Sequence, residues 1–201
     1  YRSVPDIMPA PVTPYRLSAV PVTRETITDA GIPVSEKVIE LYIDTPVKNQ
    51  GQPVWLRWRI ETVFSFTEVG CSILTYPKTC YISSFLEPGE IRILNSENIA
   101  GDYGEDHYIA AKEFSYEFDQ RHYLNVAQIS MSKAAFDFWE QVKTISNPSG
   151  TIFEIPPAPV RGNIYNVDDR AELVLGYFEA ISVDTIRTYT IPDDLPWNRL
   201  N

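Results

Sequence analysis

Residues 56–66 read LRWRIETVFSF, and this stretch decides the fold. Its apolar side chains are Leu56, Trp58, Ile60, Phe64 and Phe66, and they alternate with the polar Arg57, Arg59, Glu61 and Ser65. Successive side chains of a β-strand point to opposite faces, so a period of two indicates a strand with one face in the core and the other in solvent.

Shorter β-prone runs separated by turn residues lie on both sides of this strand. They are residues 15–20, 38–43, 71–85, 109–118, 122–129, 162–165, 173–183 and 187–191. Only Asp119 and nearby polar residues separate the runs 109–118 and 122–129, which predicts a hairpin. Many short strands with turns between them favour a mainly β fold, an antiparallel β-sandwich or barrel-like body, over a parallel α/β scheme.

One segment, about 133–146, has a helical period. Ser132 can cap its start, and Asn147, Pro148 and Gly150 end it. The apolar side chains recur at steps of three and four residues: Ala135, Phe138, Trp139, Val142 and Ile145. We expect a single α-helix packed on the β body, with Phe138 and Trp139 in the core.

The N-terminal part is rich in proline. Residues 1–35 hold six of the 16 prolines, and proline removes a backbone donor and fixes φ. We therefore expect no long regular element there. The predicted organisation is an extended segment over 1–33 followed by a β-rich domain over 34–201.

Composition excludes several classes of protein. The 201 residues are 44% hydrophobic and form no apolar run long enough to span a bilayer as a helix. A net charge of −10 and a pI near 4.7 would repel a phosphate backbone, so nucleic acid is not an expected partner.

Cys71 and Cys80 lie nine positions apart in a β-prone segment. This spacing is compatible with a disulfide across adjacent strands or a tight loop, which would indicate an oxidising compartment. Two unpaired buried thiols are the alternative.

An ordered set of motifs resembles a known family. It includes Trp58 and Arg59, residues 74–77 with Cys80, the run 132–139 and residues 150–153. The most specific part is PPAPVRGNIY at 156–165, followed by LGYF at 175–178. Over about Val34 to Ile191 the chain resembles Bacteroidetes outer-membrane lipoproteins catalogued as domain of unknown function 4249.

The resemblance implies a lipid-anchored protein of the outer membrane or cell surface, often encoded beside TonB-dependent transporters similar to the starch-utilisation porin type. It implies no enzymatic activity and no catalytic residues. The sequence lacks the family's lipobox cysteine and its first immunoglobulin-like sandwich, so residues 1–33 would correspond to that sandwich's last strand and a linker. The anchor would belong to the full precursor.

Chemical sites are few. Asp102, Glu105 and Asp106, next to His107, could hold a calcium ion, although solvated loop charges are the alternative. No cofactor is expected, because the glycines form no phosphate-binding pattern. His107 and His122 are the only histidines and no GxSxG motif occurs, so we expect a protein that is not an enzyme.

Strand alternation places Trp58 inward and Trp55 on the face of Arg57 and Arg59, a composition typical of interfaces and of sugar-stacking surfaces. Trp197, near the C-terminal end of the sequence, is a further interface candidate. Either tryptophan could instead be covered by its own chain.

Three functions follow from these observations. The first is a non-catalytic accessory subunit of an outer-membrane assembly built on a TonB-dependent transporter. The second is a separate module that binds glycans or other small ligands. The third, a glycoside hydrolase, needs two facing carboxylates, and the sequence singles out no such pair.

Overall fold

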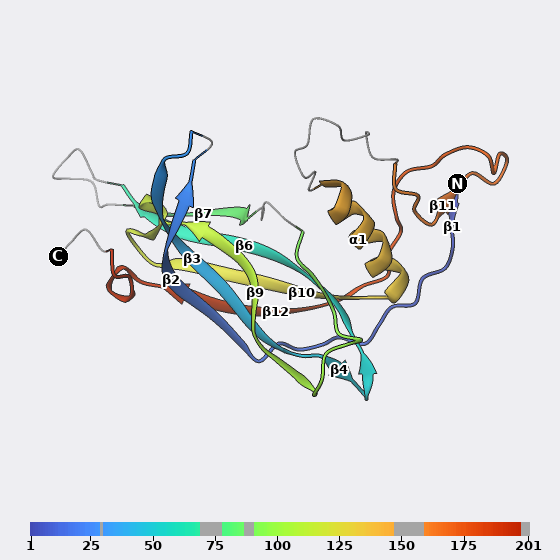
Figure 1. Ribbon diagram of the computed structural model, residues 1–201, viewed down its shortest axis with the longest axis horizontal. Coiled ribbons are helices and arrows are strands. Elements are labelled where there is room, and N and C mark those ends of the chain that lie inside the picture. Colours follow the sequence, from blue (N-terminus) through green and yellow to red (C-terminus); the bar gives the residue numbers. More distant parts are fainter. Residues whose placement is uncertain (29, 69–77, 87–90, 147–158, 198–201) are drawn as a thin grey trace.

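The structure, a computed structural model, describes residues 1–197 except 29, 69–77, 87–90 and 147–158 (Figure 1). A five-stranded sheet has the order β12-β10-β6-β7, and β8 pairs with the start of β6. Its strands are β6 (Trp55–Thr67), β7 (Thr79–Leu86), β8 (Ile93–Asn95), β10 (His122–Met131) and β12 (Ser182–Thr190). The second sheet, in the order β2-β3-β9, contains β2 (Arg16–Ile27), β3 (Pro33–Pro46) and β9 (Tyr103–Glu113).

The remaining elements are short. Two strand pairs join β1 (Arg2–Ser3) to β11 (Ile164–Tyr165) and β4 (Lys48–Asn49) to β5 (Gln52–Pro53). Helix α1 covers Lys133–Ser146, and 3-10 turns cover Tyr116–Phe118 (η1) and Pro192–Asp194 (η2). All the pairings between these strands are antiparallel.

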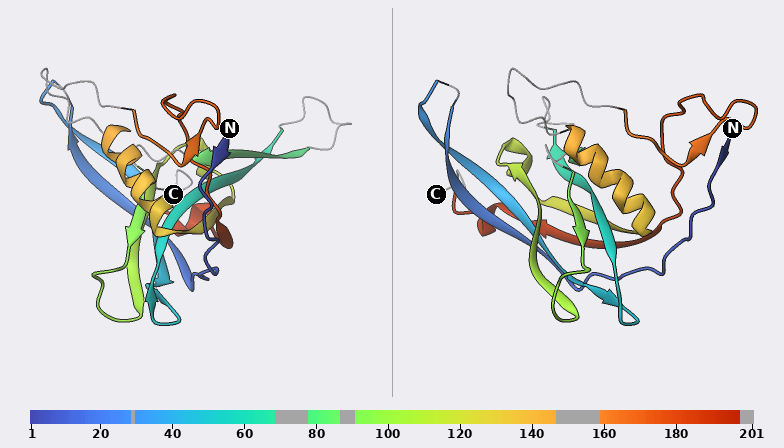
Figure 2. Two further views of the ribbon diagram at one scale, coloured as in Figure 1. Left: turned by 90° about the vertical axis from the view of Figure 1, so that its right-hand side faces the viewer. Right: turned by 45° about the vertical axis from the view of Figure 1, so that its right-hand side comes forward.

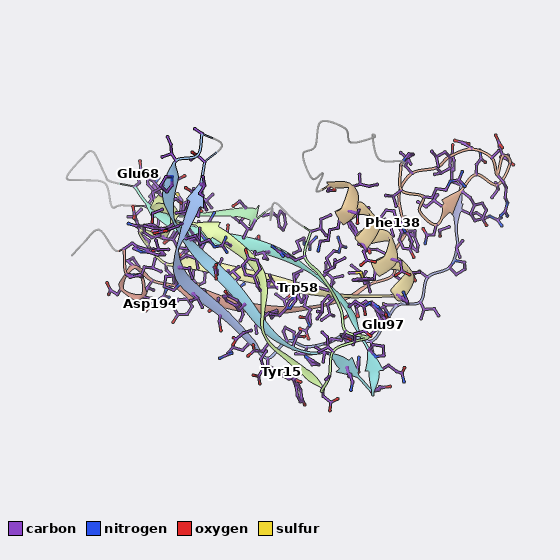
Figure 3. The ribbon with its side chains drawn as sticks, viewed as in Figure 1. Tyr15, Trp58, Glu68, Glu97, Phe138 and Asp194 are labelled. Carbon is purple, nitrogen blue, oxygen red and sulfur yellow. The ribbon has the colours of Figure 1, made fainter. Side chains whose placement is uncertain are left out.

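The hydrophobic core lies between the two large sheets. The three-stranded sheet contributes Ile39, Leu41, Ile43 and Ile109, and the five-stranded sheet contributes Leu56, Trp58, Ile60, Leu124 and Val126. Figure 3 shows Trp58 in the middle of the molecule, where it is 7% exposed. The alternation of β6 is confirmed, and so is a mainly β, sandwich-like body whose described strands form open sheets rather than a closed barrel.

The expectation that the proline-rich start holds no long strand was wrong. β2 is 12 residues long and pairs with β3 along its whole length, and its Leu17 reaches the core. The strand accommodates Pro21 because β2 is an edge strand, where a missing N–H on the outer side loses no ladder bond. Residue 33 begins β3, so residues 16–27 belong to the same body as the domain predicted to start at 34. The further interpretation, that they end a missing sandwich, stays a prediction.

The predicted hairpin between residues 109–118 and 122–129 was also wrong. β9 pairs with β3 in one sheet, whereas β10 pairs with β6 and β12 in the other. The connection through η1 therefore crosses between the sheets, and Phe118 fills the core at the crossing with 1% of its surface exposed. Local turn residues cannot distinguish a hairpin from a crossing of this length.

Helix α1 has the predicted bounds. The Ala135 N–H donates to Ser132 Oγ at 3.1 Å, which is the expected N-terminal cap. Ala135 and Phe136 are its buried residues, while Phe138 and Trp139 are half-buried. The helix thus packs on the sheet along one narrow stripe.

A buried glutamine joins the two sheets. Gln128 on β10 has no exposed surface. Its Oε1 accepts from Trp58 Nε1 at 3.0 Å, and its Nε2 donates to Thr45 Oγ1 at 2.8 Å and to the Val12 carbonyl at 2.7 Å. One side chain therefore ties β6 and β10 to β3 and to the N-terminal segment.

We predict that Gln128→Leu lowers the free energy of unfolding by at least about 3 kcal/mol, because it leaves three buried polar groups without partners at about 1–3 kcal/mol each. Urea denaturation measures the change. Gln141→Leu, on the exposed side of α1, is the matched control and should change stability by less than about 0.5 kcal/mol. Equal stability of Gln128→Leu and the wild-type protein would contradict the role of the buried network.

His122 leads to a pH prediction. Its ring is buried, stacks on Phe118 at a centroid distance of 4.2 Å, and has Nδ1 3.2 Å from the Glu117 carbonyl oxygen. Burial lowers the pKa of His122 and also that of His107. As the pH falls through the ordinary histidine pKa of about 6.5, the unfolded chain therefore binds protons that the folded chain does not.

We expect the free energy of unfolding to fall between pH 7.5 and pH 5.5, and to fall less in His122→Phe, which retains the stacked ring. Urea titrations at the two pH values measure both differences. An equal fall in the two proteins would show that His122 does not carry the effect.

Candidate functional site

The five-stranded sheet has a second face, here called the outer face, which points away from the core. Cross-strand register places Trp55, Arg57, Arg59, Glu61 and Val63 of β6 on it. Helix α1 packs across one end of this face, and the rest is not covered by the helix (Figure 2). The outer face therefore has a covered end and an open part.

Arg57, Trp139 and Glu179 hold α1 on the covered end. The Arg57 guanidinium carbon lies 3.9 Å from the Trp139 ring centroid. Arg57 Nη2 donates to Glu179 Oε1 at 2.6 Å, and Trp139 Nε1 donates to Glu179 Oε2 at 2.9 Å. Burial lowers the pKa of Arg57, whereas the charge of Glu179 acts in the opposite direction. Glu179 thus stabilises a cation that is largely removed from water.

Trp55 and Arg57, two of the interface candidates, share a face with Arg59, but the structure favours the covered alternative for Trp55. Trp55 is half-buried and packs with Met131 and Phe136 beneath α1. It also borders an apolar hollow of about 320 Å³ beside Ile7 and Pro9. Because α1 covers this end of β6, only Arg59 of the three residues Trp55, Arg57 and Arg59 is exposed. The alternation of β6 carries no information on where the helix packs.

Trp197 is packed on its own body. It is half-buried against the core cluster, with its ring centroid 5.4 Å from that of Phe114. Lys37 Nζ lies 5.9 Å from the same indole ring. The structure therefore favours the covered alternative for Trp197.

The open part of the outer face carries aromatic and planar polar side chains from four strands. They are Tyr81 and Phe85 on β7, Arg59 and Glu61 on β6, Tyr123 and Asn125 on β10, and Arg187 and Tyr189 on β12, and the aliphatic Val63 of β6 lies among them. Arg121, directly before β10, lies beside them with its guanidinium carbon 4.8 Å from the Tyr189 ring centroid.

A row of polar groups crosses three strands of the open part. Arg187 Nε donates to Asn125 Oδ1 at 2.5 Å, and Asn125 Nδ2 donates to Glu61 Oε2 at 3.3 Å. Next to the row is a hollow of about 260 Å³ lined by Val63, Tyr81, Tyr123, Asn125 and Arg187. A second hollow of about 620 Å³ lies towards α1 and includes Arg59 and Phe85 in its lining.

Sequence reasoning did not find these residues beyond Arg59. Alternation within β10 alone could have grouped Tyr123 with Asn125, since they are two positions apart. Their proximity to Arg187 and Tyr189 depends on the register between β10 and β12, which no local pattern gives.

The hairpin of β6 and β7 is a separate feature. Its outer half reaches away from the rest of the molecule (Figure 2, left). β7 reads TCYISSFL, without a charged residue, and its only partner among the described strands is β6. Phe66 and Ile82 are 52% and 47% exposed on the side of the core residue Phe64, whereas Tyr81 and Phe85 lie on the outer face. The hairpin thus presents apolar side chains on both faces.

The acidic segment does not form a ligand cluster. β9 begins at Tyr103, so Glu105 and Asp106 lie in a strand rather than in a loop. Asp106 Oδ1 is 3.0 Å from Arg16 Nη2, and Asp102 Oδ1 is 3.5 Å from Lys48 Nζ. Among the described residues, no three His, Cys, Asp or Glu side chains gather as metal ligands.

Only one of the two cysteines of the predicted disulfide lies among the described residues. Cys80 is exposed on β7, and Cys71 lies outside the described residues, so their pairing stays a prediction. The one described helix, α1, is not long and apolar enough to cross a membrane.

In the part of the chain that the structure describes, two large antiparallel sheets pack face to face, and one α-helix covers one end of the outer face. The chain belongs to the family described as Domain of unknown function (DUF4249), whose model matches residues 1–187. The match confirms the resemblance to domain of unknown function 4249 and extends it to the first 33 residues. No curated protein and no solved structure gives a significant match.

We predict that Glu179→Ala lowers the free energy of unfolding by about 2–4 kcal/mol, because it leaves the buried Arg57 cation without its carboxylate. The thermal unfolding midpoint and urea titration measure the loss. Asp137→Ala, which removes the exposed Lys133–Asp137 pair of α1, should cost less than about 0.5 kcal/mol. Similar effects of the two substitutions would contradict a special role for Glu179.

Proposed function

We propose that this chain is a non-catalytic lipoprotein module of the outer membrane or cell surface, acting as an accessory subunit of an assembly built on a TonB-dependent transporter. The projecting β6–β7 hairpin is the observation that carries the binding role. Membership of the family supports the rest, through the lipid-anchored context that the sequence resemblance implies.

The hairpin has the properties of a docking element. Proteins usually protect an edge strand with charges, a proline or a covering segment, because exposed N–H and C=O groups pair with other chains. β7 carries no charge and no proline. Apolar residues are exposed on both of its faces, Ile82 on one and Phe85 on the other. They favour a partner that pairs with the strand edge and buries these side chains.

The non-catalytic part of the proposal rests on the chemistry of the described residues. Both histidines pack against aromatic rings: His122 stacks on Phe118, and His107 lies 5.0 Å from Trp58 between ring centroids. Their pKa values are lowered by burial. Such histidines are suited to packing rather than to proton transfer with a substrate.

Purification of the full protein from the membranes of the cells that make it, in mild detergent, tests the proposal. We expect the wild-type protein to elute with an outer-membrane partner and Ile82→Lys to lose that partner, because a lysine in the exposed strand opposes apolar burial. Ile27→Lys is the matched control, since Ile27 is 76% exposed near the end of β2, far from this hairpin in sequence and in another sheet.

Circular dichroism of both variants establishes that they are folded. A wild-type protein that elutes alone at its monomer mass would overturn the proposal. Equal retention of the partner by Ile82→Lys and Ile27→Lys would remove the hairpin as the docking element.

A further inference from the structure

We propose that the open part of the outer face binds an acidic oligosaccharide, a sugar chain that carries carboxylate groups. This site overlaps the docking hairpin proposed above at Tyr81 and Phe85, but its Tyr123, Asn125, Arg187 and Tyr189 belong to β10 and β12, and it does not use Phe66, Ile82 or the free edge of β7. The inference does not depend on the proposed transporter partner.

Charge is the first reason. The chain has a net charge of −10, yet Arg59, Arg121 and Arg187 gather on or beside this face. Within the residues that the structure describes, none of the three forms an ion pair with a carboxylate. Glu61 is the one carboxylate among the named side chains of the open part. The surface is therefore locally cationic on an acidic protein, which favours an anionic ligand.

The aromatic rings are the second reason. Tyr81, Phe85 and Tyr189 are 68%, 62% and 51% exposed, and Tyr123 lies 6.0 Å from Tyr189 between ring centroids. Three of these four rings are tyrosines, which combine an apolar surface with a hydroxyl group. A sugar ring has the complementary form, with C–H groups on its face and hydroxyls around its edge.

The polar row supplies directional hydrogen bonds. Its hydrogen bonds hold Arg187 and Asn125 in place between the tyrosines and Arg59. A guanidinium held through Nε retains its terminal N–H groups, whose planar fork matches a carboxylate or two neighbouring hydroxyls. Glu61 adds a carboxylate, which accepts from sugar hydroxyls, while Asn125, only 9% exposed, positions Arg187.

The size of the face indicates a chain rather than a single small ligand. The hollows of about 260 Å³ and about 620 Å³ lie along the same strand, with Val63 lining the first and Arg59 the second. Ligand pockets for one compact molecule are typically closed clefts that bury most of its surface. An open strip of rings and arginines instead fits a linear polymer with repeated rings and repeated charges.

Titration calorimetry tests the inference with hexamers of galacturonate and of mannuronate, together with a carboxyl-reduced galacturonate hexamer and a glutamate hexapeptide. We expect at least one acidic hexamer to bind with a Kd below about 1 mM. The carboxyl-reduced sugar and the peptide should each bind at least tenfold more weakly, because each lacks one half of the recognised chemistry.

Arg187→Ala and Tyr189→Ala should each weaken the best acidic sugar at least tenfold. The matched control is Arg170→Ala, because Arg170 also stacks on a tyrosine, 4.3 Å from the Tyr165 ring centroid, but outside the open part. It should bind like the wild-type protein, and so should Ile82→Lys, which separates this site from the docking edge.

Several results would overturn the inference for protein shown to be folded. Absence of binding to both acidic sugars is one. Equal binding of the carboxyl-reduced sugar would remove the role of charge, and equal binding of the peptide would remove the saccharide. Unchanged affinity in Arg187→Ala would place any binding elsewhere.

Discussion

The rest of the structure depends on one buried side chain, Gln128, and on the three hydrogen bonds that it makes. Trp58, Thr45 and the Val12 carbonyl all reach it from different segments. A buried amide is tolerated only when its polar atoms have partners, so the segments can meet in one relative position alone. This constraint fixes the two sheets face to face and holds the N-terminal segment against them through the Val12 carbonyl.

Once the sheets are fixed, the alternation of β6 divides its side chains between two environments. Trp58 and Ile60 fill the core, which leaves Trp55, Arg57 and Arg59 on the outer face. The Arg57–Glu179 pair and the Trp139 ring then hold α1 over one end only. The rest of the outer face stays open because the contacts of Arg57 hold α1 over one end of the sheet only.

Prediction from the sequence succeeded where the deciding interactions are local. The period of β6, the inward Trp58 and the bounds of α1 all depend on neighbouring residues, including the Ser132 cap. It failed for β2, because the position of Pro21 on an edge depends on strand order, and for β9 and β10, because their separation into two sheets depends on long-range pairing. The open part was missed for the same reason: β12 brings Arg187 beside Asn125 from 62 positions away.

The arginines of the outer face differ in their surroundings: one is buried and paired with a carboxylate, and others are stacked on aromatic rings. Arg57 is 19% exposed and has a carboxylate partner, which is what burial of a cation requires. Arg59 and Arg121 instead stack on Phe85 and Tyr189, at 5.5 Å and 4.8 Å from the ring centroids. Stacking orders a guanidinium without neutralising it, so the charge stays available to an external anion. Arg57 thus serves folding, whereas Arg59 and Arg121 remain charged on the open part, as the proposed acidic ligand requires.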